Sequence, residues 1–333
     1  LDSAPAAPYP GGGATGARWQ TLRDLCHVDI AVGRLVEAHL DADAILWELT
    51  GRGTEPGEFW GVWAAEPPAP RVTAELRRGG GWILTGAKPW CSGVLSCDHA
   101  LITADVVDGG CASGERRLFA VELDAAGVRR ESADWTNAGM DRTETGTVVL
   151  DGVVGRPVGE PGAYLDRAGF WHGGIGVAAC WVGGTQKVAD ALYAKAVSAH
   201  SGLSDILLMH LGAVEAEIAT VVALLDAAAR EVDACPSDID SARRRAFRVR
   251  WSAEQRASSV IDRVGRALGP GPLVHDAEHA QAVADLRATA RALGVGWPDD
   301  QTPGQFLAGL PPDMPATLAL MSHAAGLMRG AGY

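Results

Sequence analysis

The sequence lacks several patterns that would identify a functional class directly. None of its six cysteines forms a Cys-x-x-Cys pair, and no Cys/His grouping has the spacing of zinc ligands. It has no uninterrupted run of about 18 apolar residues, so we expect no membrane span. No Gly-x-Gly-x-x-Gly follows a predicted strand and opens a helix, which argues against a Rossmann site. The scattered cysteines indicate reduced thiols in a cytoplasmic protein.

Basic residues are also scarce. The 333-residue chain has 29 lysines and arginines against 41 acidic residues, a formal net charge of −12. Nucleic-acid binding needs clustered positive charge, and the densest cluster, Arg243–Arg245, lies on a predicted helix beside acidic residues. We therefore expect no nucleic-acid partner. The chain is rich in tryptophan, however, and four of its eleven tryptophans crowd residues 60–90, which suits core packing or a planar ligand.

The apolar pattern divides the chain into three regions. Residues 18–49 repeat apolar side chains every three or four positions, as a helix does. Residues 59–150 change to short alternating strands between glycine clusters. Helical periodicity returns after Gly162, with Ser204 and Asp238 as candidate N-caps. The expected strands are 61–65, 71–77, 81–85, 99–105, 117–122, 128–130 and 146–150, and the later helices are 163–199, 203–232, 238–268, 274–294 and 315–329.

Helices followed by strands and then by helices predict an α+β fold rather than an alternating α/β fold. We expect N-terminal helices, a central β-barrel or β-sandwich domain and a C-terminal helical bundle. The predicted boundaries are a flexible tail over 1–17, a short helical domain over 18–56, the β domain over 57–158 and the bundle over 159–333.

The most informative segment is residues 80–93, Gly-Gly-Trp-Ile-Leu-Thr-Gly-Ala-Lys-Pro-Trp-Cys-Ser-Gly. It predicts a strand, a tight turn and a second strand that ends in Trp90-Cys91-Ser92. Together with Trp63-Ala64-Ala65-Glu66-Pro67, the segment 139–162 and the glycine pairs of 173–184, it resembles the acyl-CoA dehydrogenase superfamily. The resemblance covers about residues 29 to 290, with a shortened N-terminal helical domain.

That resemblance implies an FAD site between the β domain and the bundle. Trp90 and Ser92 would flank the isoalloxazine, with the Ser92 hydroxyl donating to a ring nitrogen or carbonyl, and the backbone of Ala64 and Ala65 would face the pyrimidine edge. The alternative is a strand whose Trp90 fills the core. The resemblance further implies a homodimer or homotetramer and a small-molecule substrate such as acyl-CoA or another acyl thioester.

Several positions depart from the family pattern. Ala65 replaces the family's threonine, and no arginine lies near residue 200 to reach the cofactor diphosphate. Arg266, before the Gly269 turn, is a candidate replacement, and a surface ion pair is the alternative reading. The usual catalytic glutamate near residue 293 is absent, which leaves Asp166 as a candidate base or as an acidic residue in the first turn of a helix.

Histidines offer another route. His172 follows on the helix expected to carry Asp166, and His275 and His279 have the i, i+4 spacing of one helix face. That pair suits a metal or a proton shuttle, but no third ligand is evident, so a polar face is the alternative and no metal is expected. Three functions remain open: an FAD-dependent acyl thioester oxidoreductase, a flavin-dependent monooxygenase on the same fold, and a flavin-free scaffold or binding subunit.

Overall fold

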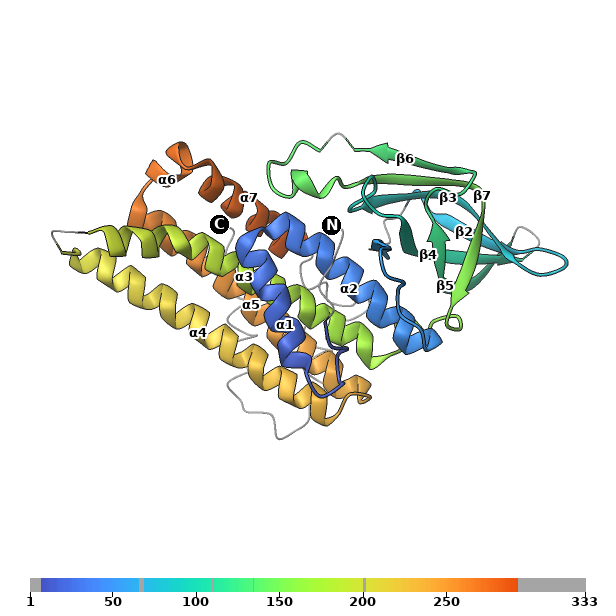
Figure 1. Ribbon diagram of the computed structural model, residues 1–333, viewed down its shortest axis with the longest axis horizontal. Coiled ribbons are helices and arrows are strands. Elements are labelled where there is room, and N and C mark those ends of the chain that lie inside the picture. The colour runs from blue at the N-terminus through green and yellow to red at the C-terminus, as the bar shows by residue number, and fades with distance from the viewer. Residues whose placement is uncertain (1–6, 66–68, 109–110, 134, 200–201, 293–333) are drawn as a thin grey trace, which may run out of the picture. The chain divides into compact units, whose positions relative to one another are not determined.

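The computed structural model describes residues 7–65, 69–108, 111–133, 135–199 and 202–292, and its elements follow the expected order of helices, strands and helices (Figure 1). The expected helix over 315–329 lies outside the described residues. The helices are α1 (Thr15–Val28), α2 (Ile30–Thr50), η1 (Asp141–Thr143), α3 (Ala168–Ser198), α4 (Asp205–Ala234), α5 (Ile239–Leu268), α6 (Gly271–His275) and α7 (Ala277–Ala292). The strands are β1 (Trp60–Trp63), β2 (Val72–Leu76), β3 (Trp82–Cys91), β4 (His99–Asp108), β5 (Cys111–Glu122), β6 (Val128–Ser132) and β7 (Gly146–Val158).

The strand pairings close into a ring. Strand β4 pairs with β2 and β5, β2 pairs with β3, β3 pairs with β7, and β7 returns to β5, while β1 and β6 extend this ring at β4 and β7. The inside is filled by side chains such as Leu84, Phe119 and Leu150, each at most 1% exposed. This ring is the barrel form of the expected β structure, whereas the division into separate domains stays a prediction.

Strand β3 corrects the turn expected within residues 80–93. The strand runs without interruption from Trp82 to Cys91, with register shifts between Leu84 and Gly86 and between Lys88 and Cys91. Gly86 has φ 129°, and a Cβ there would lie 2.2 Å from the carbonyl oxygen of Arg71. The glycine that suggested a turn therefore permits a bulge that brings two backbones together.

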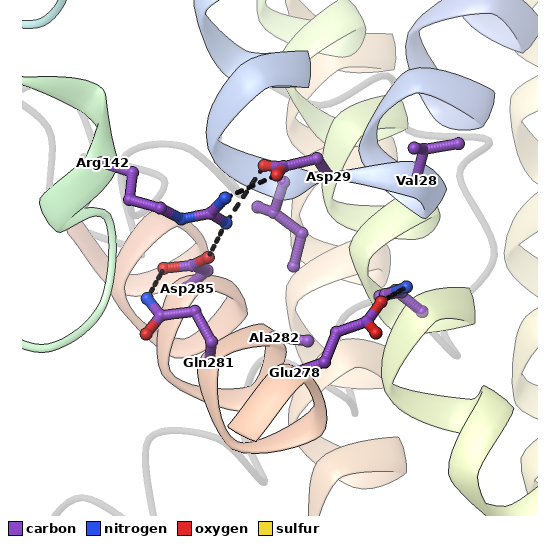
Figure 2. Close-up of a pocket in the computed structure, with 9 residues that line it drawn as sticks. Val28, Asp29, Arg142, Glu278, Gln281, Ala282 and Asp285 are labelled. Carbon is purple, nitrogen blue, oxygen red and sulfur yellow. Dashed lines mark hydrogen bonds and ion pairs between the residues drawn. The ribbon is translucent and has the colours of Figure 1, made fainter. Parts of the chain in front are cut away.

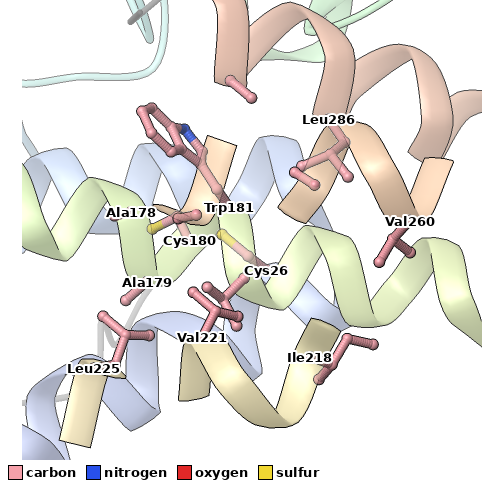
Figure 3. Close-up of a cluster of buried hydrophobic side chains, with 14 of the residues drawn as sticks. Cys26, Ala178, Ala179, Cys180, Trp181, Ile218, Val221, Leu225, Val260 and Leu286 are labelled. Atoms are coloured by element: carbon pink, nitrogen blue, oxygen red, sulfur yellow. The ribbon is translucent and has the colours of Figure 1, made fainter. Parts of the chain in front are cut away.

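The helices pack around α3, which contacts α1, α2, α4, α5 and α7. Trp181 and Ile175 of α3 are fully buried, and Figure 3 shows Trp181 among apolar side chains from the surrounding helices. The expected helix over 18–49 is two helices, because the Asp29 carboxylate caps α2 by accepting a hydrogen bond from the Val32 N–H at 3.1 Å. Ser204 and Asp238 cap α4 and α5, as predicted.

Helix α4 has an unusually apolar outer face. It is long and apolar enough to cross a membrane by length and composition, with a mean hydropathy of 1.7, although no uninterrupted apolar run predicted such a helix. A core helix of a soluble protein passes the same test, and α4 packs on α5, α3 and α1. Ile206, Leu208 and Met209 nevertheless remain 48–66% exposed.

Candidate functional site

The ends of β1 and β3 meet at one edge of the barrel. The indole Nε1 of Trp63 donates a 3.0 Å hydrogen bond to the carbonyl oxygen of Ser92, just after β3. Ala64 is half-buried and Ala65 is exposed where the chain leaves β1. The fold therefore brings the two predicted flavin-facing segments together, and we call Trp63, Ala64, Trp90, Ser92 and the adjacent Thr145 the barrel-edge seat.

Trp90 is displayed rather than packed. Its side chain is 64% exposed, whereas Trp60 and Trp63 are each 3% exposed, so the core-filling alternative for Trp90 is wrong. Its φ is 62°, a left-handed conformation that costs a non-glycine residue roughly 1 kcal/mol or more. Trp90 lies within the register shift of β3 between Lys88 and Cys91, and its flat aromatic ring is at the surface two residues before Ser92.

A series of hydroxyl groups continues inward from Ser92. Ser92 Oγ lies 2.9 Å from Thr145 Oγ1, which lies 2.9 Å from Thr143 Oγ1. Thr143 Oγ1 then donates to the carbonyl oxygen of Met140 at 2.6 Å. We call this series the hydroxyl chain. The sequence analysis did not identify Thr143 or Thr145 as site residues, although both lie within the matched segment 139–162.

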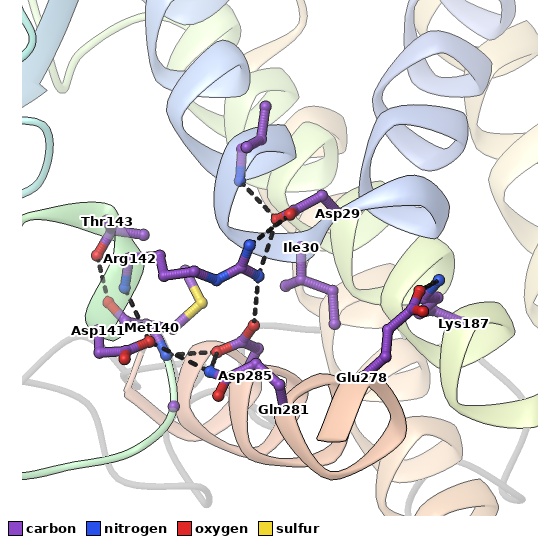
Figure 4. Close-up of polar contacts among 12 residues, drawn as sticks. Asp29, Ile30, Met140, Asp141, Arg142, Thr143, Lys187, Glu278, Gln281 and Asp285 are labelled. Carbon is purple, nitrogen blue, oxygen red and sulfur yellow. Dashed lines mark hydrogen bonds and ion pairs between the residues drawn. The ribbon is translucent and has the colours of Figure 1, made fainter. Parts of the chain in front are cut away.

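An arginine clamp holds the far end of the hydroxyl chain (Figure 4). Arg142 donates to Asp29 Oδ2 at 2.6 Å and to Asp285 Oδ2 at 3.4 Å, and Asp285 Oδ1 accepts the Met140 N–H at 2.6 Å. Burial acts to raise the pKa of Asp29, but hydrogen bonds from Arg142 and from the Val32 N–H outweigh it, and the pKa is lowered. The clamp thus ties η1 to α2 and α7.

A cavity of about 270 Å³ lies beside this clamp, between α2, α3 and α7 (Figure 2). Its charged lining residues are paired, since Arg142 binds Asp29 and Asp285 while Lys187 binds Glu278. The described lining therefore offers no free cation to a phosphate. Its remaining described lining residues are Val28, Ile30, Gln281 and Ala282.

Two predicted cofactor residues lie outside the seat. Arg266 has a side chain 69% exposed and donates to Asp262 one helical turn away at 2.8 Å, as its surface ion-pair reading anticipated. Gly269 caps α5, which packs on α3, α4 and α7. The structure does not bring Arg266 or Gly269 together with Trp90 and Ser92.

The predicted base, Asp166, is not in the first turn of a helix. It is exposed in the turn that precedes α3, where Arg167 occupies the N-cap position. His172, on α3, is 2% exposed, and burial, aided by Arg245 and Arg167, lowers its pKa to about 4. It is therefore neutral at ordinary pH and its Nε2 has no hydrogen-bond partner.

The predicted histidine pair does not share a helix. His275 ends α6, and the Asp276 carboxylate accepts the His279 N–H at 3.0 Å at the start of α7. This cap breaks the helix between them and overturns the one-face interpretation. Within the part of the chain that the structure describes, no group of three or more His, Cys, Asp or Glu side chains could hold a metal ion.

No family model matches the chain. A curated relative, dibenzothiophene monooxygenase of Mycolicibacterium goodii, is 29% identical over 174 residues, which are 46% of this chain and 42% of the relative. The match therefore spans less than half the length of that relative.

Solved structures show the same fold over most of the chain. FMN-bound TdsC of Paenibacillus sp. A11-2 has a TM-score of 0.73 at 19% identity and covers 90% of this chain and 86% of its own. KijD3 in complex with FMN and a dTDP-sugar has a TM-score of 0.72 at 18% identity, covering 94% and 87%. Butyryl-CoA dehydrogenase of Megasphaera elsdenii has a TM-score of 0.72 at 17% identity, covering 85% and 79%. At these identities the likeness establishes the fold.

Proposed function

The chain has the acyl-CoA dehydrogenase fold, and on that premise we propose that it is a flavin-dependent monooxygenase acting on a small organic substrate. The observation that carries the proposal is the barrel-edge seat, where Trp90 exposes its ring two residues before Ser92 and the hydrogen bond from Trp63 to Ser92 joins this segment to the end of β1. A planar ligand would cover this ring, and burying the exposed indole in this way would contribute favourable free energy to binding. The residues present therefore fit a flavin ring.

The flavin would supply the hydride-transfer and oxygen chemistry of the reaction. In this site Trp90 would stack on or flank the ring, Ser92 would hydrogen-bond its edge, and the backbone of Ala64 would approach it. Trp63 would hold the two segments at fixed separation through its bond to Ser92. The sequence comparison supports oxygen transfer, since the matched relative is a dibenzothiophene monooxygenase.

FMN suits the seat better than the FAD that the sequence predicted. FAD carries one phosphate more than FMN, and this added charge would need a cation, but Arg266 is paired with Asp262 and is not at the seat. The charged residues around the cavity are paired as well. Two of the solved structures of this fold, KijD3 and TdsC, contain FMN, in agreement with this choice.

The acyl thioester dehydrogenase is the second candidate. It requires a base at the substrate's α-carbon, and Asp166, the residue predicted for this role, is exposed in the turn before α3. Butyryl-CoA dehydrogenase has the same fold, so we retain this reaction as a candidate for the experiments below. The third candidate, a flavin-free binding subunit, predicts no flavin uptake at all.

Two experiments separate these candidates. Purified protein is first titrated with oxidised FMN and FAD, and Trp90→Ala is compared with a control, Trp251→Ala, whose tryptophan is 45% exposed on α5, outside the seat. We expect saturable flavin binding that only Trp90→Ala weakens. Protein loaded with reduced flavin is then given oxygen with dibenzothiophene or indole, and oxidised protein is given butyryl-CoA without oxygen. A product one oxygen atom heavier supports the monooxygenase, and anaerobic bleaching by butyryl-CoA supports the dehydrogenase instead.

A further inference from the structure

We infer that Ser92 can only accept a hydrogen bond from a bound flavin, so that the seat favours the reduced ring over the oxidised ring. The inference rests on the proposed flavin site and assigns the donor and the acceptor of one of its hydrogen bonds. It also reverses the expectation that Ser92 donates to the ring. It follows from the proton count along the hydroxyl chain.

Each hydroxyl group has one proton, and a backbone carbonyl has none. Thr143 therefore must donate to the Met140 carbonyl at 2.6 Å. Its oxygen accepts the bond from Thr145 at 2.9 Å, which uses the single proton of Thr145. The 2.9 Å contact between Thr145 and Ser92 then requires Ser92 to donate. Only lone pairs of Ser92 remain for a ligand.

The backbone around the hydroxyl chain is strained. Among the described residues, the non-glycine residues with positive φ are Trp90 at 62°, Met140 at 63° and Glu144 at 48°. Trp90 lies two residues before Ser92, Met140 supplies the terminal carbonyl, and Glu144 separates the two threonines. Such strain persists where surrounding contacts enforce one arrangement. All three of these described residues lie along the hydroxyl chain.

Those surrounding contacts fix the terminal carbonyl and the buried threonine. The Met140 N–H is held by Asp285, whose carboxylate is 1% exposed, and Arg142 binds the same carboxylate (Figure 4). The Gly93 N–H donates to the Thr143 carbonyl at 2.7 Å, which fixes η1 against the turn that carries Ser92. Thr143 is only 2% exposed, so water does not compete for its proton. The fold therefore sets the direction in which the hydroxyl groups of the hydroxyl chain donate their protons.

A serine that can only accept a hydrogen bond distinguishes the oxidised flavin from the reduced flavin. Reduction adds a hydrogen to a ring nitrogen that is only an acceptor in the oxidised ring, so an accepting Ser92 gains a partner on reduction. The oxidised nitrogen facing the same oxygen receives no donor. A hydrogen bond that one state makes and the other lacks favours the first state by a factor of roughly five to ten.

The test interrupts the hydroxyl chain while keeping Ser92. In Thr145→Val the serine proton loses its acceptor and becomes free to donate to the oxidised ring. We expect the ratio of Kd for oxidised flavin to Kd for reduced flavin to fall roughly five- to tenfold, and a tenfold fall lowers the potential of the bound flavin by about 30 mV. Thr147→Val, two residues later on β7 and outside the hydroxyl chain, should leave the ratio unchanged.

The readouts are anaerobic binding titrations in both redox states and a dye-coupled potential measurement. Thr143→Val should shift the Kd ratio in the same direction. Thr143 is buried, so this variant could fail to fold; Thr145→Val, at a half-buried position, then tests the inference alone. An unchanged ratio, or equal weakening of both states in Thr145→Val, overturns the inference. Failure of the unaltered protein to bind flavin overturns the proposed function instead.

Discussion

The indole nitrogen of Trp63 and the carbonyl oxygen of Ser92 lie 3.0 Å apart and join two segments that are 29 residues apart in the chain. Trp63 ends β1 and Ser92 follows β3, strands that do not pair with each other in the described ladder. This hydrogen bond thus links the end of β1, next to Ala64, to the turn that follows Trp90.

Replacing Trp63 by Phe removes the donor and keeps an aromatic ring in the core. We expect flavin affinity to fall roughly five- to tenfold, because the loss of one hydrogen bond frees the two segments and leaves the Ser92 carbonyl unpaired. Fluorescence titration measures the change. Trp82→Phe, on β3 but away from the seat, is the control, and equal losses in both variants would show that the bond has no special role.

Replacing Arg142 by Met removes the clamp. The buried Asp285 carboxylate loses its cation, which should lower the free energy of unfolding by about 2 kcal/mol. Arg129→Met is the control, because its 3.8 Å contact with Glu131 is between exposed side chains and should change stability by less than about 0.5 kcal/mol. Denaturant unfolding measures both, and equal effects would contradict the role of the clamp.

The same clamp predicts an acid sensitivity. The pKa of Asp29 is lowered from its ordinary value of 3.8 in the folded chain, so Asp29 contributes stability above that pH. The contribution is lost as the pH falls toward the lowered pKa. Unfolding measured from pH 5 down to about 2 should show a shallower loss in Arg142→Met than in the unaltered chain.

His172 predicts a second pH dependence with a different window. Its pKa is lowered from 6.5 to about 4, so above pH 6.5 it has no effect on stability. Between these values the unfolded chain binds a proton that the folded chain does not, and stability falls as the pH falls, by roughly 3 kcal/mol in total. His172→Phe should reduce this slope, while His275→Phe, at an exposed position, serves as control. An unchanged slope in His172→Phe would contradict the assignment.

The apolar outer face of α4 predicts self-association, in line with the expected homodimer or homotetramer. Ile206 and Met209 are 66% and 59% exposed and lie three residues apart on one face. Light scattering should give a mass above that of one chain, and Ile206→Lys combined with Met209→Lys should lower it. Val197→Lys, at an exposed apolar position on α3, should not. A monomeric unaltered protein would refute this prediction.

The sequence predicted the order of the elements well, because that order depends on local patterning. Alternation and helical periodicity located most strands and helices, and the side chains of Ser204 and Asp238 gave two true caps. Local patterning could not reveal that Gly86 permits a bulge instead of a turn, because the reason is the approach of the carbonyl of Arg71, the residue before β2.

The site was harder to predict, because its polar groups meet only in three dimensions. Trp90 and Ser92 were found through a motif, but the hydroxyl chain through Thr143 and Thr145 needs η1 folded against the turn after β3. The predicted positions of Arg266 and Asp166 relied on family spacing, and in the fold Arg266 is paired with Asp262 and Asp166 is exposed. Spacing alone does not show which surface a side chain reaches.

The most direct test of the central claim is a flavin titration of the purified protein. Oxidised FMN and FAD are added separately while flavin fluorescence and the visible absorption band are followed, with Trp90→Ala and Trp251→Ala in parallel. The account predicts stoichiometric uptake, tighter for FMN than for FAD, and weakened only in Trp90→Ala. A colourless protein that takes up neither flavin would contradict it.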